Sequence, residues 1–275
     1  MSKYESRAFN TVEDQVVKSS KDALKLFYEF NQYCLFPQEI KNYFPNPISY
    51  TFDGSVARYS MDRIDSNNLG LLVATDQITD LQLSKALCEV FEFKKACPIK
   101  EETPLKVFDV SYKLVIEKTE ARIAYDRQLL KILDKLKDAY FTYARSRKTW
   151  KLSVSHGDLC FSNILWDSKT ETIKLVDPRG AATLEDLYLD EYYDLAKLSH
   201  SIFGNYEGIL YGHPIKTKGI QDLFLSHLNT QNISLELLKV YEASLFLSMI
   251  PLHSENEERS ILFKNKAVDI LKEIL

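Results

Sequence analysis

The chain has 275 residues, of which 45% are hydrophobic, and its 35 basic and 39 acidic side chains leave a formal net charge of −4. This globular balance argues against disorder, and its acidic sign disfavours a dedicated surface for nucleic acid or anionic membrane. No apolar run approaches the roughly 18 residues of a membrane span, so we expect no membrane insertion. The four cysteines lack CxxC spacing, which favours reduced thiols and a cytoplasmic location. No glycine precedes Gly54, which excludes an N-terminal dinucleotide-binding fingerprint or P-loop.

Residues 1–65 form a strand-rich region by pattern. Extended stretches are predicted at residues 6–9, 15–17, 48–52 and 56–61. Ser20 is a suitable N-cap for a helix over 21–36, and a polar run over 10–14 separates the first two extended stretches. The dipeptide Asp53-Gly54 favours a hairpin turn between the last two strands.

Residues 66–275 are predicted to be mainly helical, after a polar linker over 62–68. Apolar residues recur with the helical period in three segments, and the end of the chain is also expected to be helical: 83–91, 118–147, 238–249 and from about 257. Short apolar strands at 164–166 and 173–176 flank a polar turn. The pattern therefore predicts an α+β fold with a strand-rich first region and a larger helical second region.

One segment carries a chemical pattern: Ser155-His156-Gly157-Asp158-Leu159-Cys160-Phe161-Ser162-Asn163, followed by the predicted hairpin and Asp177. A hairpin centred on Thr170 would place Asn163 opposite Asp177, at the ~5 Å spacing of cross-strand partners. An amide oxygen and a carboxylate together suit Mg²⁺. The nearby Asp158 could then accept a proton from an attacking hydroxyl, as in phosphoryl transfer. The alternative is a set of turn residues that hydrogen-bond locally.

These residues resemble the catalytic loop and metal-binding aspartate of the aminoglycoside phosphotransferase and choline kinase group. This group is the small-molecule branch of the protein-kinase-like fold. The resemblance implies two lobes, residues 1–65 and 66–275, with ATP or GTP and Mg²⁺ in the cleft between them. It implies that Asp158 is the catalytic residue and that Asn163 and Asp177 hold Mg²⁺.

The resemblance extends to the expected nucleotide site of the first lobe. It implies that Lys18 steadies the α- and β-phosphates and that Glu29 is its ion-pair partner. Met61 and Arg63 fall where the inter-lobe hinge of this group offers backbone groups to adenine. Without the resemblance, the sequence would be interpreted as placing Lys18 at a solvated strand end and Glu29 on an exposed helix face.

Two further residues would support the catalytic loop by the same resemblance. His156 is expected to be structural rather than a ligand or acid, and Asp194 resembles the aspartate that braces the loop. The sequence departs from the group at two places. The phosphate-covering loop lacks glycine, so that Ser6-Arg7 or nearby backbone would take its part, and Asp177 is followed by Pro-Arg rather than Phe-Gly.

The acceptor is expected to be a small molecule with a hydroxyl group. His-Gly-Asp-Leu and Asp-Pro-Arg-Gly resemble kinases of bacterial surface-polysaccharide pathways, which suggests a sugar, with a choline-like amino alcohol next. Candidate acceptor-binding residues are Arg179, Asp190 and Tyr192. The alternatives are that the acidic, tyrosine-rich stretch 184–194 is a helix start with solvated acids and buried rings, and that Arg179 forms a structural pair with one of those acids. The basic run 145–151 is expected to be a solvated helix end. The rival function is a pseudokinase that serves as a nucleotide-binding or scaffolding module, and the oligomeric state stays open.

Overall fold

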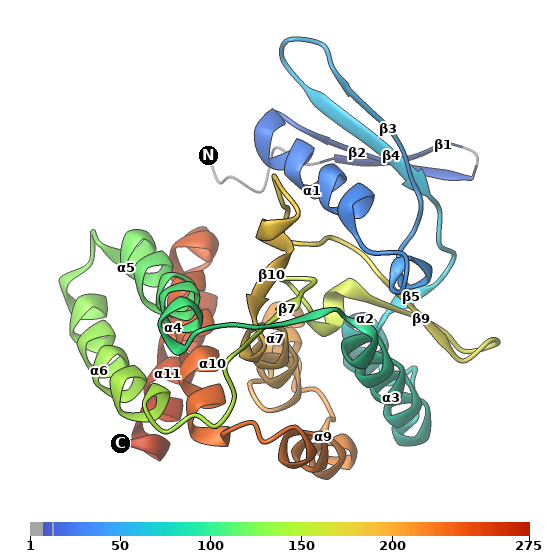
Figure 1. The fold of residues 1–275 in the computed structure, drawn as a ribbon. Helices are drawn as coiled ribbons and strands as arrows, with labels where there is room; N and C mark the ends of the chain where they lie inside the picture. The colour runs from blue at the N-terminus through green and yellow to red at the C-terminus, as the bar shows by residue number, and fades with distance from the viewer. Residues whose placement is uncertain (1–7, 13) are drawn as a thin grey trace.

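A four-stranded antiparallel sheet forms the N-terminal part of the computed structural model, which describes residues 8–12 and 14–275 (Figure 1). The strands lie in the order β1-β2-β4-β3, with the bounds β1 (Ala8–Val12), β2 (Gln15–Ser20), β3 (Pro47–Phe52) and β4 (Ala57–Asp62). Strand β1 continues to Val12, which pairs with Gln15, so it includes part of the polar run that was expected to separate the two strands. Gly54 has a φ of 90°, and the Asp53 carboxylate accepts a hydrogen bond from the Val56 N–H at 2.8 Å, which confirms the turn between β3 and β4.

Helix α1 (Ala23–Leu35) packs against this sheet and is followed by the short 3₁₀-helix η1 (Lys41–Tyr43). The helix begins two residues later than the sequence predicted, because Asp22 rather than Ser20 caps it. The Asp22 carboxylate accepts a hydrogen bond from the Lys25 N–H at 3.1 Å. The buried residues of α1 recur with the helical period and include two polar side chains: Leu26, Glu29, Gln32 and Tyr33. Buried polar groups require hydrogen-bond partners: Glu29 has Lys18 of β2, and the partners of Gln32 lie in the second lobe.

Helices dominate the rest of the chain. They are α2 (Leu69–Ala74), α3 (Asp80–Ala96), α4 (Pro104–Tyr112), the π-helix η2 (Lys113–Glu117), α5 (Lys118–Ile123), α6 (Arg127–Ala144), α7 (Tyr192–Ile202), α8 (Tyr206–Tyr211), α9 (Lys218–Thr230), α10 (Leu235–Met249) and α11 (Glu257–Ile274), with the 3₁₀-helices η3 (Phe161–Asn163), η4 (Glu185–Leu187) and η5 (Ile250–His253). The segment 118–147, predicted as one helix, contains two, because the Asp126 carboxylate caps α6 by accepting from the N–H groups of Gln128 and Leu129.

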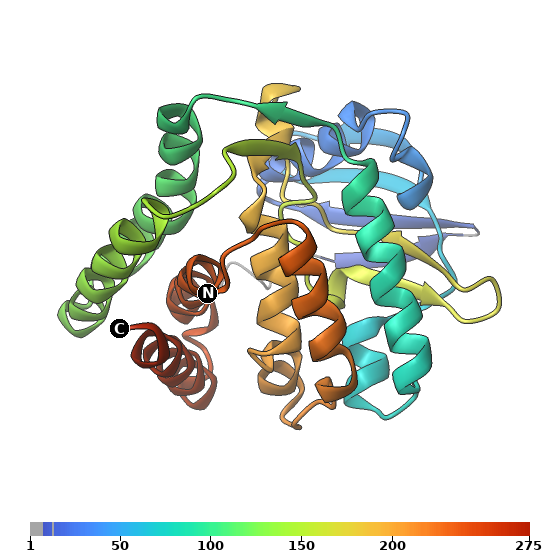
Figure 2. The same cartoon turned by 60° about the horizontal axis from the view of Figure 1, so that its bottom comes forward.

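Helix α10 lies at the centre of the helical lobe. It is buried along almost its whole length, which is typical of a helix that is apolar on all sides. The orange and red helices of the C-terminal third lie between the green helices α4 to α6 on one side and the teal helices α2 and α3 on the other (Figure 2). Within the described residues, no helix combines the length and apolarity that crossing a membrane would require.

Two small antiparallel sheets support the loops that follow them. Their orders are β10-β7-β6 and β5-β8-β9, with the bounds β5 (Asn67–Asn68), β6 (Ile99–Glu101), β7 (Lys151–Val154), β8 (Ile164–Asp167), β9 (Thr172–Leu175) and β10 (Tyr188–Asp190). Strands β8 and β9 form the predicted hairpin, but its register differs by one residue. Ile164 pairs with Leu175, so Asn163 stands opposite Val176, whose N–H donates to the Asn163 carbonyl at 3.0 Å. The expected pairing of Asn163 with Asp177 is therefore wrong.

Candidate active site

Asp158 lies in the loop between β7 and η3, and its side chain is 42% exposed. Its Oδ1 is 2.7 Å from the Nζ of Lys197, a residue of α7. Burial raises the pKa of Asp158, but the Lys197 ammonium outweighs this effect and lowers the pKa to about 2. The carboxylate is therefore ionised at neutral pH and available to accept a hydrogen bond from a hydroxyl group.

Asp194 on α7 holds the backbone that precedes Asp158. Its two carboxylate oxygens accept hydrogen bonds from the His156 N–H at 3.0 Å and the Gly157 N–H at 2.8 Å. Lys94 of α3 lies 3.1 Å from the same carboxylate, and this contact was not predicted from the sequence. Gly157 has a φ of 79°, and a Cβ there would lie 2.6 Å from the Cβ of Arg179. A side chain at this position would therefore force the loop and the Arg179 segment apart.

His156 links the loop to the end of strand β9. Its Nδ1 accepts a hydrogen bond from the Asp158 N–H at 3.2 Å, and its Nε2 lies 3.0 Å from the Val176 carbonyl oxygen. Because Nδ1 accepts, the proton must be on Nε2, which donates to the carbonyl. Complete burial lowers the pKa of His156, which keeps the ring neutral. The geometry gives His156 a structural contact on each ring nitrogen.

Asn163 and Asp177 lie on either side of the hairpin's open end. The Asn163 Nδ2 donates to the Asp158 carbonyl at 2.8 Å, which fixes the plane of the amide and directs its oxygen the other way. Asp177 has a φ of 56°, so the chain turns out of the strand there, and its N–H donates to the Tyr33 hydroxyl at 2.9 Å. An amide oxygen and a partly exposed carboxylate are the hard oxygen donors that suit Mg²⁺, so these residues fit that metal.

Lys18 of β2 connects the two lobes. Its fully buried ammonium lies 2.7 Å from Glu29 Oε2 and 2.9 Å from Asp177 Oδ1. A buried lysine requires such carboxylate partners to remain charged. Ser6 and Arg7, the residues expected to cover the phosphates, lie outside the described part of the chain.

Helix α1 adds contacts that the sequence did not indicate. The Gln32 Nε2 donates to the Ser155 carbonyl at 3.0 Å, and its Oε1 accepts from the Gly180 N–H at 2.6 Å. The Asn31 Nδ2 donates to the Ala181 carbonyl at 2.9 Å. The helix that carries Glu29 therefore also holds the segments before Asp158 and after Asp177.

Met61 and Arg63 lie at the end of β4. Met61 is buried and pairs with Val16, and the Arg63 N–H donates to the Asp14 carbonyl at 2.9 Å. The Arg63 amide is therefore already used within the sheet. A role of these residues in binding adenine stays a prediction.

Two acceptor-binding candidates do not face the site. Asp190 is fully buried and accepts from both terminal nitrogens of Arg147, at 2.6 Å and 3.2 Å. Tyr192 is also fully buried, and its hydroxyl accepts from the Ser234 N–H at 2.9 Å. The prediction for these two residues is wrong, because their polar groups are used inside the lobe. The basic run over 145–151 was also wrongly expected to be fully solvated, since the Arg147 side chain is only 1% exposed.

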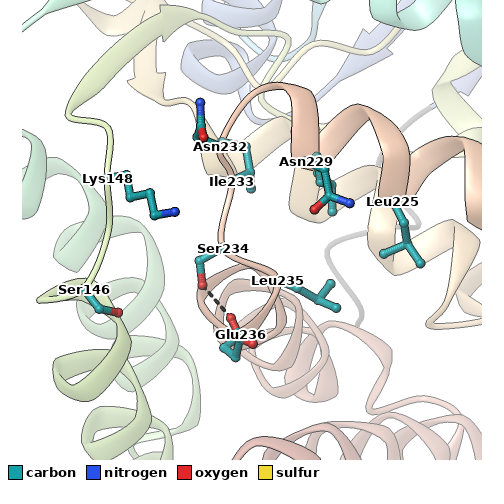
Figure 3. A pocket seen from close by; sticks show the side chains of 10 residues that line it. Ser146, Lys148, Leu225, Asn229, Asn232, Ile233, Ser234, Leu235 and Glu236 are labelled. Atoms are coloured by element: carbon teal, nitrogen blue, oxygen red, sulfur yellow. Dashed lines mark hydrogen bonds between the residues drawn. The ribbon is translucent and has the colours of Figure 1, made fainter.

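Arg179, the third candidate, is exposed and borders a cavity of about 500 Å³ that Tyr28 of α1, Leu114 of η2 and Leu189 of β10 also line. Another cavity, of about 580 Å³, lies where residues 146–148 face the end of α9 and the start of α10 (Figure 3). The residues that line it, among them Lys148, Asn229 and Ser234, are drawn in Figure 3. None of them is a predicted site residue. Of these two cavities, the one beside Arg179 is therefore the one that a predicted site residue lines.

Known structures share this arrangement of elements. No model of a known protein family matches the chain, and no curated protein does. A thermostable mutant of aminoglycoside phosphotransferase APH(4)-Ia matches with a TM-score of 0.63 at 13% identity, covering 97% of this chain and 94% of that one. A glucosamine kinase matches with 0.61 at 11% identity, covering 98% and 78%, and an ethanolamine kinase from Plasmodium vivax with 0.53 at 13%, covering 98% and 82%. The chain therefore has the two-lobed protein-kinase-like fold of the small-molecule kinases, with a strand-rich first lobe and a helical second lobe.

Proposed function

We propose that this protein is a kinase that transfers the γ-phosphoryl group of ATP or GTP, with Mg²⁺, to a hydroxyl group of a small molecule. One observation carries the proposal: Lys18 contacts Asp177, and Asn163 contacts the backbone of Asp158 and of the residue before Asp177. A related phosphotransferase structure contains AMP-PNP and hygromycin B, which supports a site for nucleotide and acceptor together. We place the division between the lobes at about residue 65.

The residues divide the work of phosphoryl transfer between positioning and electrostatics. Lys18 would contact the α- and β-phosphates while Glu29 holds it, and Asn163 and Asp177 would hold Mg²⁺, which neutralises phosphate charge when bound. The acceptor oxygen forms a bond to the γ-phosphorus as the bond to the bridging oxygen breaks and the nucleoside diphosphate leaves. The hydroxyl proton passes to the Asp158 carboxylate and from there to solvent.

A sugar or sugar derivative is our first candidate acceptor, and a choline-like amino alcohol is the second. The resemblance to kinases of bacterial surface-polysaccharide pathways supports the sugar, and we place the reaction in the cytoplasm, where nucleotide triphosphates are made. The alternative is a pseudokinase, suggested by the glycine-free phosphate loop. The ionised Asp158 beside the Asn163 amide argues for turnover, because a scaffold needs neither.

A nucleotide-consumption screen with the full chain tests the proposal. Sugars, amino sugars, sugar acids and amino alcohols are offered with ATP or GTP and Mg²⁺, and thermal shift records nucleotide binding in parallel. We expect diphosphate release with at least one acceptor and none with Asp158→Asn. Nucleotide binding without release for any acceptor would support the pseudokinase, and a melting temperature unchanged by millimolar nucleotide would overturn the proposed function.

A further inference from the structure

Three cationic side chains act electrostatically on the hydroxyl of Tyr193, which lies one turn before Lys197 on α7. The Lys118 Nζ donates to the Tyr193 oxygen at 2.5 Å, and Lys197 contacts the nearby Asp158. Burial raises the pKa of Tyr193, but Lys118, Lys197 and Arg179 outweigh this effect and lower it to about 8. Lys118 therefore contacts the buried Tyr193 hydroxyl, and Lys197, one turn further along α7, contacts the Asp158 carboxylate.

The negative charge near this cluster does not balance it. Asp158 is matched by Lys197, and the Lys18 ammonium lies between two carboxylates, those of Glu29 and Asp177. This leaves Lys118, which bonds to a neutral tyrosine, and Arg179. Among the residues that the structure describes, the Arg179 guanidinium has no hydrogen-bond or ion-pair partner.

Charges elsewhere on the neighbouring cavity are already paired. Glu185 contacts Lys100 at 2.7 Å and Lys106 at 3.4 Å. Lys113 lies 2.8 Å from Asp109, and the Asp186 carboxylate accepts from the Thr183 N–H at 2.8 Å. The acidic side chains that line this cavity therefore already have hydrogen-bond or ion-pair partners. Among the described residues that line it, Arg179 is the cation whose guanidinium has no such partner.

The backbone before Lys118 has an unusual geometry. Residues Lys113–Glu117 form a π-helix, and the Lys118 N–H bonds to the Lys113 carbonyl five residues earlier. Such wide turns are rare and occur frequently at functional sites. This one places Leu114 in the wall of the cavity and Lys118 against Tyr193.

We propose that the acceptor carries an anionic group, a carboxylate or a phosphate, which Arg179 and Lys118 bind while its hydroxyl lies at Asp158. This inference rests on the proposed function and narrows its substrate to acidic hydroxylated compounds such as sugar acids and sugar phosphates. Arginine forms paired hydrogen bonds with either anion, whereas the ammonium group of an amino sugar or amino alcohol would be repelled by the cluster.

Acceptors with one carbon skeleton and different charge test the proposal. Glucose, glucosamine, glucuronate and glucose 1-phosphate form one set, and glycerol, serinol, glycerate and glycerol 3-phosphate form another. We expect the acidic members of a set to exceed the neutral and amino members at least tenfold in kcat/KM. Arg179→Gln and Lys118→Gln should each reduce this preference at least tenfold, chiefly through KM. The matched controls Arg127→Gln and Lys131→Gln remove exposed charges of α6 and should leave it unchanged.

If no compound of either acceptor set is phosphorylated, a binding experiment tests whether the site binds an anion. Inorganic sulfate is titrated into protein saturated with AMP-PNP and Mg²⁺, and the melting temperature is followed. We expect a saturable rise for the wild type that is at least tenfold weaker in Arg179→Gln, an exposed site where folding is not at risk. Preference for a neutral or amino acceptor, or an equal sulfate response in wild type and variant, would overturn the anionic acceptor but not the kinase. Absence of stabilisation by AMP-PNP would instead count against the proposed function.

Discussion

The carboxylate of Asp158 and the ammonium group of Lys197 form a 2.7 Å ion pair between the catalytic loop and helix α7. The pair keeps the pKa of Asp158 at about 2, so the aspartate is a weak base. A loose phosphoryl-transfer transition state needs little proton removal before the new bond forms, so a weak base can serve. The pair therefore points to an aspartate that chiefly orients the acceptor hydroxyl.

Asp158→Asn should reduce kcat by about 10² to 10⁴, the usual contribution of a positioned acid or base. The amide keeps the shape of the side chain but cannot take the hydroxyl proton. The nucleotide dissociation constant should change less than about twofold, because the phosphate contacts belong to other residues. Diphosphate release and nucleotide titration measure the two effects. Equal turnover in wild type and variant would remove Asp158 from the mechanism.

Lys197→Met should make activity sensitive to acid. Burial alone raises the pKa of Asp158, and Lys197 is the principal charge that opposes it. Without Lys197 the pKa rises, so kcat/KM should fall as the pH is lowered from 7 to 5, whereas no loss from Asp158 is expected in the wild type. Lys197→Arg keeps the charge and should keep the wild-type profile. Parallel profiles for Lys197→Met and the wild type would contradict this account.

The hairpin after the catalytic loop shows which features of the fold a local sequence pattern can predict. The polar turn and its two apolar strands were predictable, because turn residues and strand residues have local signatures. The register was not, since it depends on a four-residue turn and on the left-handed conformation of Glu171 within it. A shift of one residue would reverse the face of a side chain in a regular strand, and the turn at Asp177 instead brings its carboxylate to Lys18.

Pairs of residues that are far apart in the chain could not be predicted from the sequence. Lys118 and Tyr193 are 75 residues apart, and no spacing rule connects a helix start to a second helix at that distance. Asp190 and Arg147 each look like surface charges, and only the tertiary fold buries them as a pair, 43 residues apart in the sequence. The catalytic-loop residues could be predicted from the sequence because they lie within one short segment. The cations near them could not, because they come from separate parts of the chain.

Lys18→Met should raise the dissociation constant for ATP at least tenfold, because the lysine is the cation that the first lobe directs at Asp177. Glu29→Gln should have a smaller effect, since the amide oxygen can still accept from Lys18. Lys21→Met removes an exposed lysine three residues away and is the matched control. Isothermal titration with Mg²⁺ and ATP measures all three. Wild-type affinity in Lys18→Met would refute the assignment.

Asp177→Asn should raise the Mg²⁺ concentration for half-maximal nucleotide binding at least tenfold, because a metal bound by few protein oxygens loses its only predicted carboxylate. Asn163→Ala should act on the metal and also loosen the loop, since the hydrogen bond to the Asp158 carbonyl is lost. Metal titrations at fixed nucleotide separate the two variants from the wild type. An unchanged midpoint in Asp177→Asn would exclude it as a ligand.

Glu207 on α8 should make the stability of the fold depend on pH. It is fully buried, and its Oε1 accepts from the Ser162 N–H at 3.2 Å and the Ser201 hydroxyl at 2.9 Å. Burial raises its pKa from 4.5 to about 7, so the folded state binds this proton more tightly than the unfolded chain. The resulting stability is complete below pH 4.5 and falls by about 1.4 kcal/mol per pH unit until the pH passes 7.

Glu207→Gln removes the titrating proton while its amide oxygen keeps both hydrogen bonds. We therefore expect a weaker dependence of the melting temperature on pH between 5 and 8 than in the wild type. Part of the slope should remain, because burial also raises the pKa of Glu242 to about 7. Glu258→Gln, at an exposed position of α11, is the control and should follow the wild-type curve. Identical slopes in wild type and Glu207→Gln would mean that the Glu207 carboxyl ionises in the folded protein as it does in the unfolded chain.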